Sequence, residues 1–154
     1  MIGSEQSARF VEMVHATFAR GGTVKFQARG RSMEPTVGDG AVVAIDAIER
    51  APIRVGDVVL CRVNGDGLVL HRLVRLEPGW YLSVRGDAPS AQPDRIPREA
   101  LLGRAIGVLE NGRMRRLDGA VTRLRVLARR ALHRLRPMRP WARSRRARAE
   151  EQTP

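Results

Sequence analysis

Residues 23–117 form a succession of short runs with alternating apolar positions, and this pattern restricts the possible folds more than any other feature. Three of the turns between the runs are built on residues that accept a positive φ: Gly65-Asp66-Gly67, Pro78-Gly79 and Asn111-Gly112. The runs predicted as strands are 23–29, 41–48, 57–64, 67–77, 80–85, 103–110 and 113–117. Short strands at this spacing predict a mostly β fold, a curled antiparallel sheet or small barrel.

Helical patterns flank the β region on both sides. The first helix should present one apolar face, formed by Phe10, Val11, Val14 and Phe18, and end at Gly21-Gly22. Beyond residue 118 a second helical pattern has apolar residues on one side and arginines on the other, as far as Pro137. We therefore expect an N-terminal amphipathic helix in residues 1–22, a β domain in 23–118, and a basic amphipathic helix with a disordered tail in 119–154.

The net charge of +12 is concentrated at the C-terminal end, where residues 119–154 hold eleven arginines and two glutamates. The rest of the chain is nearly neutral and offers few aromatic side chains for stacking on bases, which disfavours a nucleic-acid-binding function. The segment from Gly119 to Pro154 could instead contact the anionic inner face of a membrane. The alternative is that its apolar stripe packs on the β domain.

Cysteine and histidine are scarce, and this limits the chemistry. Cys61 is the single cysteine, so an internal disulfide is impossible, and its apolar neighbours favour a buried position. The three histidines are scattered, so we expect no metal and no other cofactor. Neither a signal peptide nor an apolar span of about 20 residues is evident, which predicts a cytoplasmic protein.

The segment from Gly30 to Thr36, Gly-Arg-Ser-Met-Glu-Pro-Thr, follows a predicted strand directly and contains a candidate nucleophile. Glycine and proline around Ser32 can force an abrupt change of direction that projects its hydroxyl. Neighbouring backbone N–H groups could then face an incoming carbonyl. The alternative is an ordinary turn serine that hydrogen-bonds its own backbone.

A serine nucleophile needs a base, and the candidates can be counted. The single lysine, Lys25, lies seven residues before Ser32 on the strand that leads into the loop, so a Ser-Lys dyad is nearly excluded. His71 shares a strand face with Val69 and Leu73, an apolar setting that favours a neutral ring near pH 7. A histidine packed in the core is the alternative, and His15 and His133 are weaker candidates for the base.

A histidine base benefits from a carboxylate that holds its tautomer. Asp87 follows the predicted strand 80–85, which the Pro78-Gly79 turn should place beside the strand of His71. Asp87 is therefore the first candidate for this role, and Asp94 is the reserve. Gly86-Asp87 is equally compatible with an ordinary structural turn.

Together these segments resemble the S24/S26 peptidase superfamily, in particular the Ser-His signal peptidases of the archaeal and endoplasmic-reticulum type. The resemblance covers about residues 24–117. Its motifs, in order, are Ser32-Met33-x-Pro35, Gly56-Asp57-Val58-Val59, Leu70-His71-Arg72-Leu73-Val74 and Arg85-Gly86-Asp87. The layout, with a leading helix and no membrane anchor, is similar to small bacterial members of the superfamily.

The resemblance implies a serine endopeptidase of signal-peptidase type with no cofactor, acting on a peptide or protein substrate. Ser32 would be the nucleophile, His71 the base, and Asp87 the acidic residue of the last motif. The oxyanion and the substrate cleft would be formed around Gly30, Arg31, Met33 and Pro35, with backbone N–H groups of Gly30 and Ser32 as donors. Two departures, Arg31 at a position that is commonly glycine and the missing anchor, keep open a peptide-binding or regulatory module without turnover.

Overall fold

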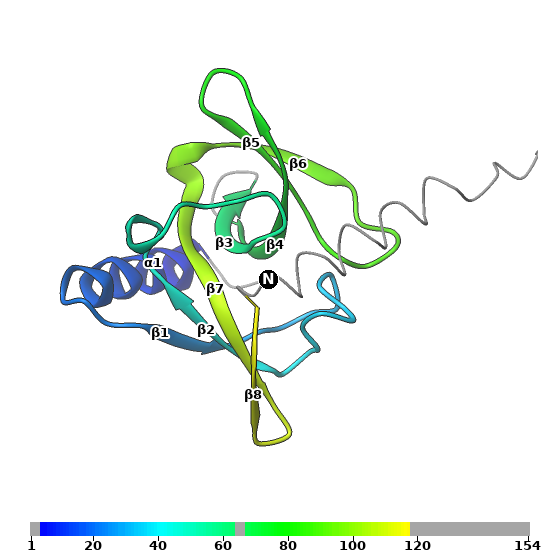
Figure 1. Cartoon of the computed structure of the whole chain (residues 1–154). Helices are drawn as coiled ribbons and strands as arrows, with labels where there is room; N and C mark the ends of the chain where they lie inside the picture. The colour runs from blue at the N-terminus through cyan, green and yellow to red at the C-terminus, as the bar shows by residue number, and fades with distance from the viewer. Residues whose placement is uncertain (1–3, 64–66, 118–154) are drawn as a thin grey trace, which may run out of the picture.

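The computed structural model describes residues 4–63 and 67–117, which form one helix and a single antiparallel sheet (Figure 1). The helix is α1 (Ser4–Ala19), and two short 3-10 helices are η1 (Ile48–Arg50) and η2 (Arg98–Ala100). The strands are β1 (Val24–Gln27), β2 (Val42–Asp46), β3 (Val58–Val63), β4 (Gly67–Glu77), β5 (Tyr81–Arg85), β6 (Pro93–Pro97), β7 (Leu101–Glu110) and β8 (Arg113–Arg116).

The strands are arranged in the order β1-β2-β7-β3-β4-β5-β6, with β8 paired to β7. Every pairing is antiparallel, and the pairing register shifts at Ala44/Ile45, Leu60/Cys61 and Leu73/Arg75. Such irregularities bend strands and increase their twist. The sheet accordingly curls strongly in Figure 1, which confirms the predicted mostly β, curled antiparallel fold.

The curled sheet has a separate apolar cluster on each of its faces. Along β3, Leu60 belongs to the first cluster, whereas Val59 and Cys61 belong to the second, because successive side chains of a strand point to opposite faces. Helix α1 covers the first cluster with Val11 and Val14, as the spacing predicted. Val14 is fully buried, which stabilises the fold by about 1.5–3 kcal/mol relative to an exposed side chain.

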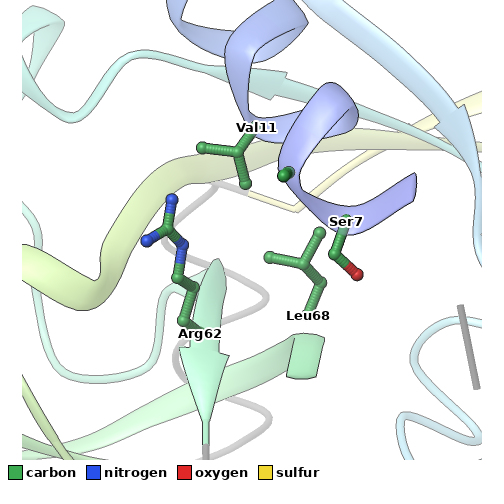
Figure 2. A pocket seen from close by; sticks show the side chains of 5 residues that line it. Ser7, Val11, Arg62 and Leu68 are labelled. Carbon is green, nitrogen blue, oxygen red and sulfur yellow. The ribbon is translucent and has the colours of Figure 1, made fainter. Parts of the chain in front are cut away.

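A small pocket of about 100 Å³ lies between α1 and the hairpin of β3 and β4. Figure 2 shows Ser7 and Val11 of the helix facing Arg62 and Leu68 of the two strands. Leu68 packs against the first apolar cluster, so the pocket is on the helix-covered side of the sheet. None of the predicted catalytic side chains lines it, and it is not the candidate catalytic cleft.

Strand β6 is not among the strands predicted from the sequence, which left residues 86–102 without a strand. Prolines at both ends of Pro93–Pro97 hide the strand pattern, since proline removes a backbone donor. Here the prolines are tolerated because β6 is at the edge of the sheet and pairs with β5 alone among the described strands. Ile96 is 2% exposed and fastens this edge to the second apolar cluster.

Among the described residues, no helix is long and apolar enough to cross a membrane. The basic helix and tail expected in residues 119–154 lie outside the described residues.

Candidate active site

The loop between β1 and β2 holds Ser32 at the surface by anchoring the residues around it. The base of the loop is closed by a hydrogen bond from the Ala28 N–H to the Ala41 carbonyl at 2.8 Å. Met33 and Val37 are 4% and 1% exposed and belong to the first apolar cluster, whereas Ser32 itself is exposed. The loop therefore presents the hydroxyl-bearing residue outward on a buried support.

The two backbone N–H groups predicted as oxyanion donors, those of Gly30 and Ser32, differ in their hydrogen bonding. The Gly30 N–H donates to the Asp39 carboxylate at 2.7 Å, so it is already used within the loop. The Ser32 N–H donates to no acceptor among the described residues and stays available to a ligand. Gly30 has φ 92°, a conformation that favours glycine, and its contribution is to turn the chain before Ser32.

Two residues predicted to form the substrate cleft, Arg31 and Pro35, lie at the surface. The Arg31 side chain is 82% exposed and its Nε donates to Glu34 at 3.0 Å. This pairing raises the pKa of the Arg31 guanidinium. Pro35 is exposed and follows a cis peptide bond.

The Ser32 backbone is fastened to the segment that leaves β5. The Ala88 N–H donates to the Ser32 carbonyl at 2.9 Å. Gly86 lies so close that a Cβ on it would be 2.5 Å from the same carbonyl oxygen, so only glycine fits without a shift. Because Arg85 pairs with Arg72, the residue after His71, this attachment brings the Ser32 loop to the strand that carries the candidate base.

His71 is 8% exposed and faces the second apolar cluster together with Val69 and Leu73, the face that its spacing predicted. Its Nδ1 lies 3.5 Å from Oδ2 of Asp94 and makes no hydrogen bond within the described residues. Burial lowers the pKa of the His71 imidazole below its usual 6.5, and this outweighs the opposing effects of Asp94 and Asp87. The ring is therefore held as the neutral form, which can accept a proton.

Asp87, the first candidate for orienting His71, is engaged elsewhere. Its Oδ1 accepts a hydrogen bond from Arg72 Nε at 2.7 Å, and its Oδ2 accepts from Arg72 Nη2 and from Thr36 Oγ1, each at 2.5 Å. The strand β6 instead brings Asp94, the reserve candidate, next to His71. The side chains of His71 and Arg72 point to opposite faces of β4, which explains why they take different carboxylates.

Arg72 is the centre of a buried polar network that connects three segments of the chain. It is 1% exposed, and its Nη1 donates to the Gly56 carbonyl at 2.6 Å while its Nη2 also donates to Thr36 Oγ1 at 3.2 Å. With the pair to Asp87, the guanidinium joins the Ser32 loop to the segment after β5 and to the segment before β3. Bidentate arginine–carboxylate pairs are geometrically specific, so this network fixes how the loop lies against the sheet.

Sequence reasoning missed the roles of Thr36 and Arg72, although both lie inside the motifs that it singled out. The sequence signal was an arginine within an apolar strand run, directly after the histidine. A charge buried in such a strand requires a partner, which indicates a polar network around Arg72. Lys25 is exposed on β1, which β2, β7 and β3 separate from β4. Within the described part of the chain, no group of three or more acidic, histidine or cysteine side chains is arranged to hold a metal ion.

Comparison with known proteins places this chain in a family. A family model described as Peptidase S24-like matches residues 3–106, which include α1, the Ser32 loop, His71 and both carboxylates. A search of curated proteins found no match. The family also includes repressors and inactive members, so the match indicates a peptidase fold. On this evidence the chain belongs to the S24-like peptidase family.

Proposed function

We propose that this protein is a serine endopeptidase that cleaves a peptide bond through an acyl-enzyme, with Ser32 as the nucleophile and His71 as the general base. The observation that carries the proposal is a buried histidine with a lowered pKa, placed against Asp94 on β4, while the exposed Ser32 loop is fastened to the segment that follows the neighbouring strand β5. A neutral histidine and an exposed serine are the two groups that this chemistry requires.

In the proposed reaction His71 accepts the proton of the Ser32 hydroxyl as Oγ attacks the scissile carbonyl. Because Nδ1 faces Asp94, the accepting atom is Nε2. The Ser32 N–H, which has no acceptor among the described residues, would donate to the oxyanion. The protonated imidazole then gives its proton to the leaving amine, and a water molecule activated by His71 hydrolyses the ester, which releases the acid product and restores the hydroxyl.

Within this proposal Asp94 is the positioning residue and Asp87 is a support. The separation of 3.5 Å between Asp94 and His71 is long for a hydrogen bond, and such contacts commonly tighten when substrate binds. A carboxylate at Nδ1 stabilises the imidazolium that forms during the reaction. Asp87 would act indirectly, since its pair with Arg72 holds the Ser32 loop against the sheet.

The substrate that fits this site is an extended peptide. The outer edge of β6 carries no partner strand among the described residues, and Asp94 lies on that strand beside His71. An added peptide strand could pair with a free edge through main-chain hydrogen bonds. This geometry supports binding by strand addition near the catalytic pair.

Acylation of Ser32 tests the proposal without a known substrate. The full-length protein is incubated with a fluorophosphonate, and intact mass is followed for the wild type, Ser32→Ala and His71→Ala. We expect one adduct on the wild type, none on Ser32→Ala, and strongly slowed labelling of His71→Ala. His15→Ala is the matched control, because His15 is exposed on α1 and should label like the wild type.

The second candidate is a peptide-binding or regulatory module on the same fold, without turnover. The observation that favours it is the charged, exposed Arg31 directly beside Ser32, where a substrate would approach. Under this alternative the wild type and Ser32→Ala would show the same mass after treatment while both still bind extended peptides.

For location, we propose a cytoplasmic protein whose segment from Gly119 to Pro154 contacts anionic lipid. Its eleven arginines support the electrostatic part of this proposal. A chain that ends at Asp118 should retain Ser32 labelling and sediment less with anionic vesicles at low salt, because it lacks these arginines. Equal sedimentation of the two chains would contradict the proposal.

A further inference from the structure

The hairpin between β4 and β5 exposes apolar side chains that no described element covers. Trp80 is 73% exposed, Leu76 is 53% exposed and Tyr81 is 37% exposed. In Figure 1 the turn of this hairpin projects from the body of the molecule. These three side chains, here called the hairpin tip, line an open cavity of about 370 Å³ together with Arg98.

The hairpin tip makes contacts with β6 and η2 although it is exposed. Trp80 has φ 62°, a conformation that bulky residues rarely adopt, and its carbonyl accepts a hydrogen bond from the Arg98 N–H at 2.8 Å. The Arg95 guanidinium lies 3.7 Å from the centre of the Tyr81 ring, and that of Arg98 lies 5.7 Å from the centre of the Trp80 ring. A large apolar side chain held outward in an unfavourable backbone conformation points to a role at the surface.

Charged groups surround the hairpin tip with a small excess of arginine. Arg75 and Arg95 both pair with Glu77, at 2.8 and 2.9 Å, and their side chains are 72% and 58% exposed. Arg98 and Glu99 are also exposed. The group thus presents three arginines and two glutamates around aromatic and aliphatic side chains.

We propose that the hairpin tip inserts into the interface of an anionic membrane, with Trp80 and Leu76 at the boundary between headgroups and acyl chains. Tryptophan and tyrosine favour this boundary, and arginine reaches from it to the phosphate groups. The charge of +12 on the whole chain attracts it to such a surface.

A protein partner and a nucleic acid fit the hairpin tip less well. A stable protein interface buries about 800 Å² on each partner, far more than three side chains on a projecting turn can offer. One arginine already lies near each of the two rings, Tyr81 and Trp80, which reduces the ring surface open to a base. Leu76 has no face for stacking, whereas acyl chains accept its apolar side chain.

This contact would hold the catalytic strand near the lipid. Strand β4 leads from Leu76 back to His71, and five residues of a strand span about 17 Å. The proposal does not depend on peptidase activity, because it rests on side chains outside the Ser32 and His71 site.

The fluorescence of Trp80 in the full-length chain tests the proposal. Trp141→Phe leaves Trp80 as the single tryptophan, since the chain has two. Vesicles of phosphatidylcholine with phosphatidylglycerol should shift its emission to shorter wavelength, and brominated acyl chains should quench it. Vesicles of phosphatidylcholine alone should give a weaker effect, and Ser32→Ala should behave like its parent, which separates this result from the fate of the proposed activity.

A second measurement uses vesicle binding of matched variants in the chain with both tryptophans. Trp80→Ala should lower partitioning by about tenfold, the equivalent of losing one buried aromatic side chain. Met114→Ala, which removes another large side chain that is 52% exposed, should change it little. Vesicle binding that leaves the Trp80 emission unchanged would overturn the proposal, because the lipid would then be bound elsewhere. A shift caused by DNA and not by vesicles would overturn it equally.

Discussion

Replacing each of the two carboxylates near the site by an amide, in separate variants, distinguishes the role of Asp87 from that of Asp94. Asp87→Asn removes the charge that pairs with Arg72, whose side chain is almost wholly buried. Leaving a buried charge without its partner costs about 3 kcal/mol. For a chain of this size that corresponds to a melting temperature lower by roughly 10 °C.

Asp94→Asn should change the stability little and the acylation rate strongly. The Asp94 side chain is 33% exposed and its contact with His71 is 3.5 Å long, so the free energy of unfolding should change by less than about 1 kcal/mol. The acylation rate should fall by roughly 100-fold, because the imidazolium loses its carboxylate. Asp94 also raises the pKa of His71, so the pH dependence of the residual labelling should move to lower pH.

The assay combines thermal unfolding by circular dichroism with the rate of fluorophosphonate labelling over a range of pH. Labelling of Asp87→Asn is measured below its melting temperature, so that loss of fold is not mistaken for loss of chemistry. The two assignments are wrong if Asp87→Asn melts like the wild type and loses labelling while Asp94→Asn labels normally. Asp87 would then be the orienting carboxylate that the sequence motif indicated.

Three further predictions follow from the packing of the described residues. Gly86→Ala should slow Ser32 labelling because the new Cβ would press on the Ser32 carbonyl. Gly38→Ala is the control, since its Cβ would meet nothing closer than 3.5 Å, and it should label like the wild type. Equal labelling rates of the two variants would contradict this prediction. The labelling rate should rise with pH below pH 6.5 and then level off, since the pKa of His71 is lowered and the ring is neutral above that pKa. A rate that is flat from about pH 5 to 8 would exclude His71 as the base. Burial raises the pKa of the Cys61 thiol to about 12, so Ellman's reagent should react with it only after unfolding, and rapid reaction of the native protein would show that the core opens.

The local sequence pattern was sufficient to predict which side chains of a strand or helix share a face and which strands are neighbours across a short turn. The period of two places His71 with Val69 and Leu73, and the 3.6-residue period puts Val11 and Val14 of α1 into the core, because side-chain direction within one element depends on neighbouring residues alone. The scarcity of lysine, with Lys25 on the strand that leads into the loop, is enough to disfavour a Ser-Lys dyad. The turn at Pro78-Gly79 likewise made β4 and β5 neighbours.

The choice between Asp87 and Asp94 depended on contacts between distant segments. Both are acidic residues shortly after β5, and local sequence favoured the one in the clearer motif. Because β6 pairs with β5, Asp94 lies next to His71. Arg72 points to the opposite face of β4, where it pairs with Asp87. Likewise, Asp39 takes the Gly30 N–H only because the loop closes on itself. Which carboxylate meets which donor is set by strand pairing and burial, and these are properties of the folded chain that no single segment encodes.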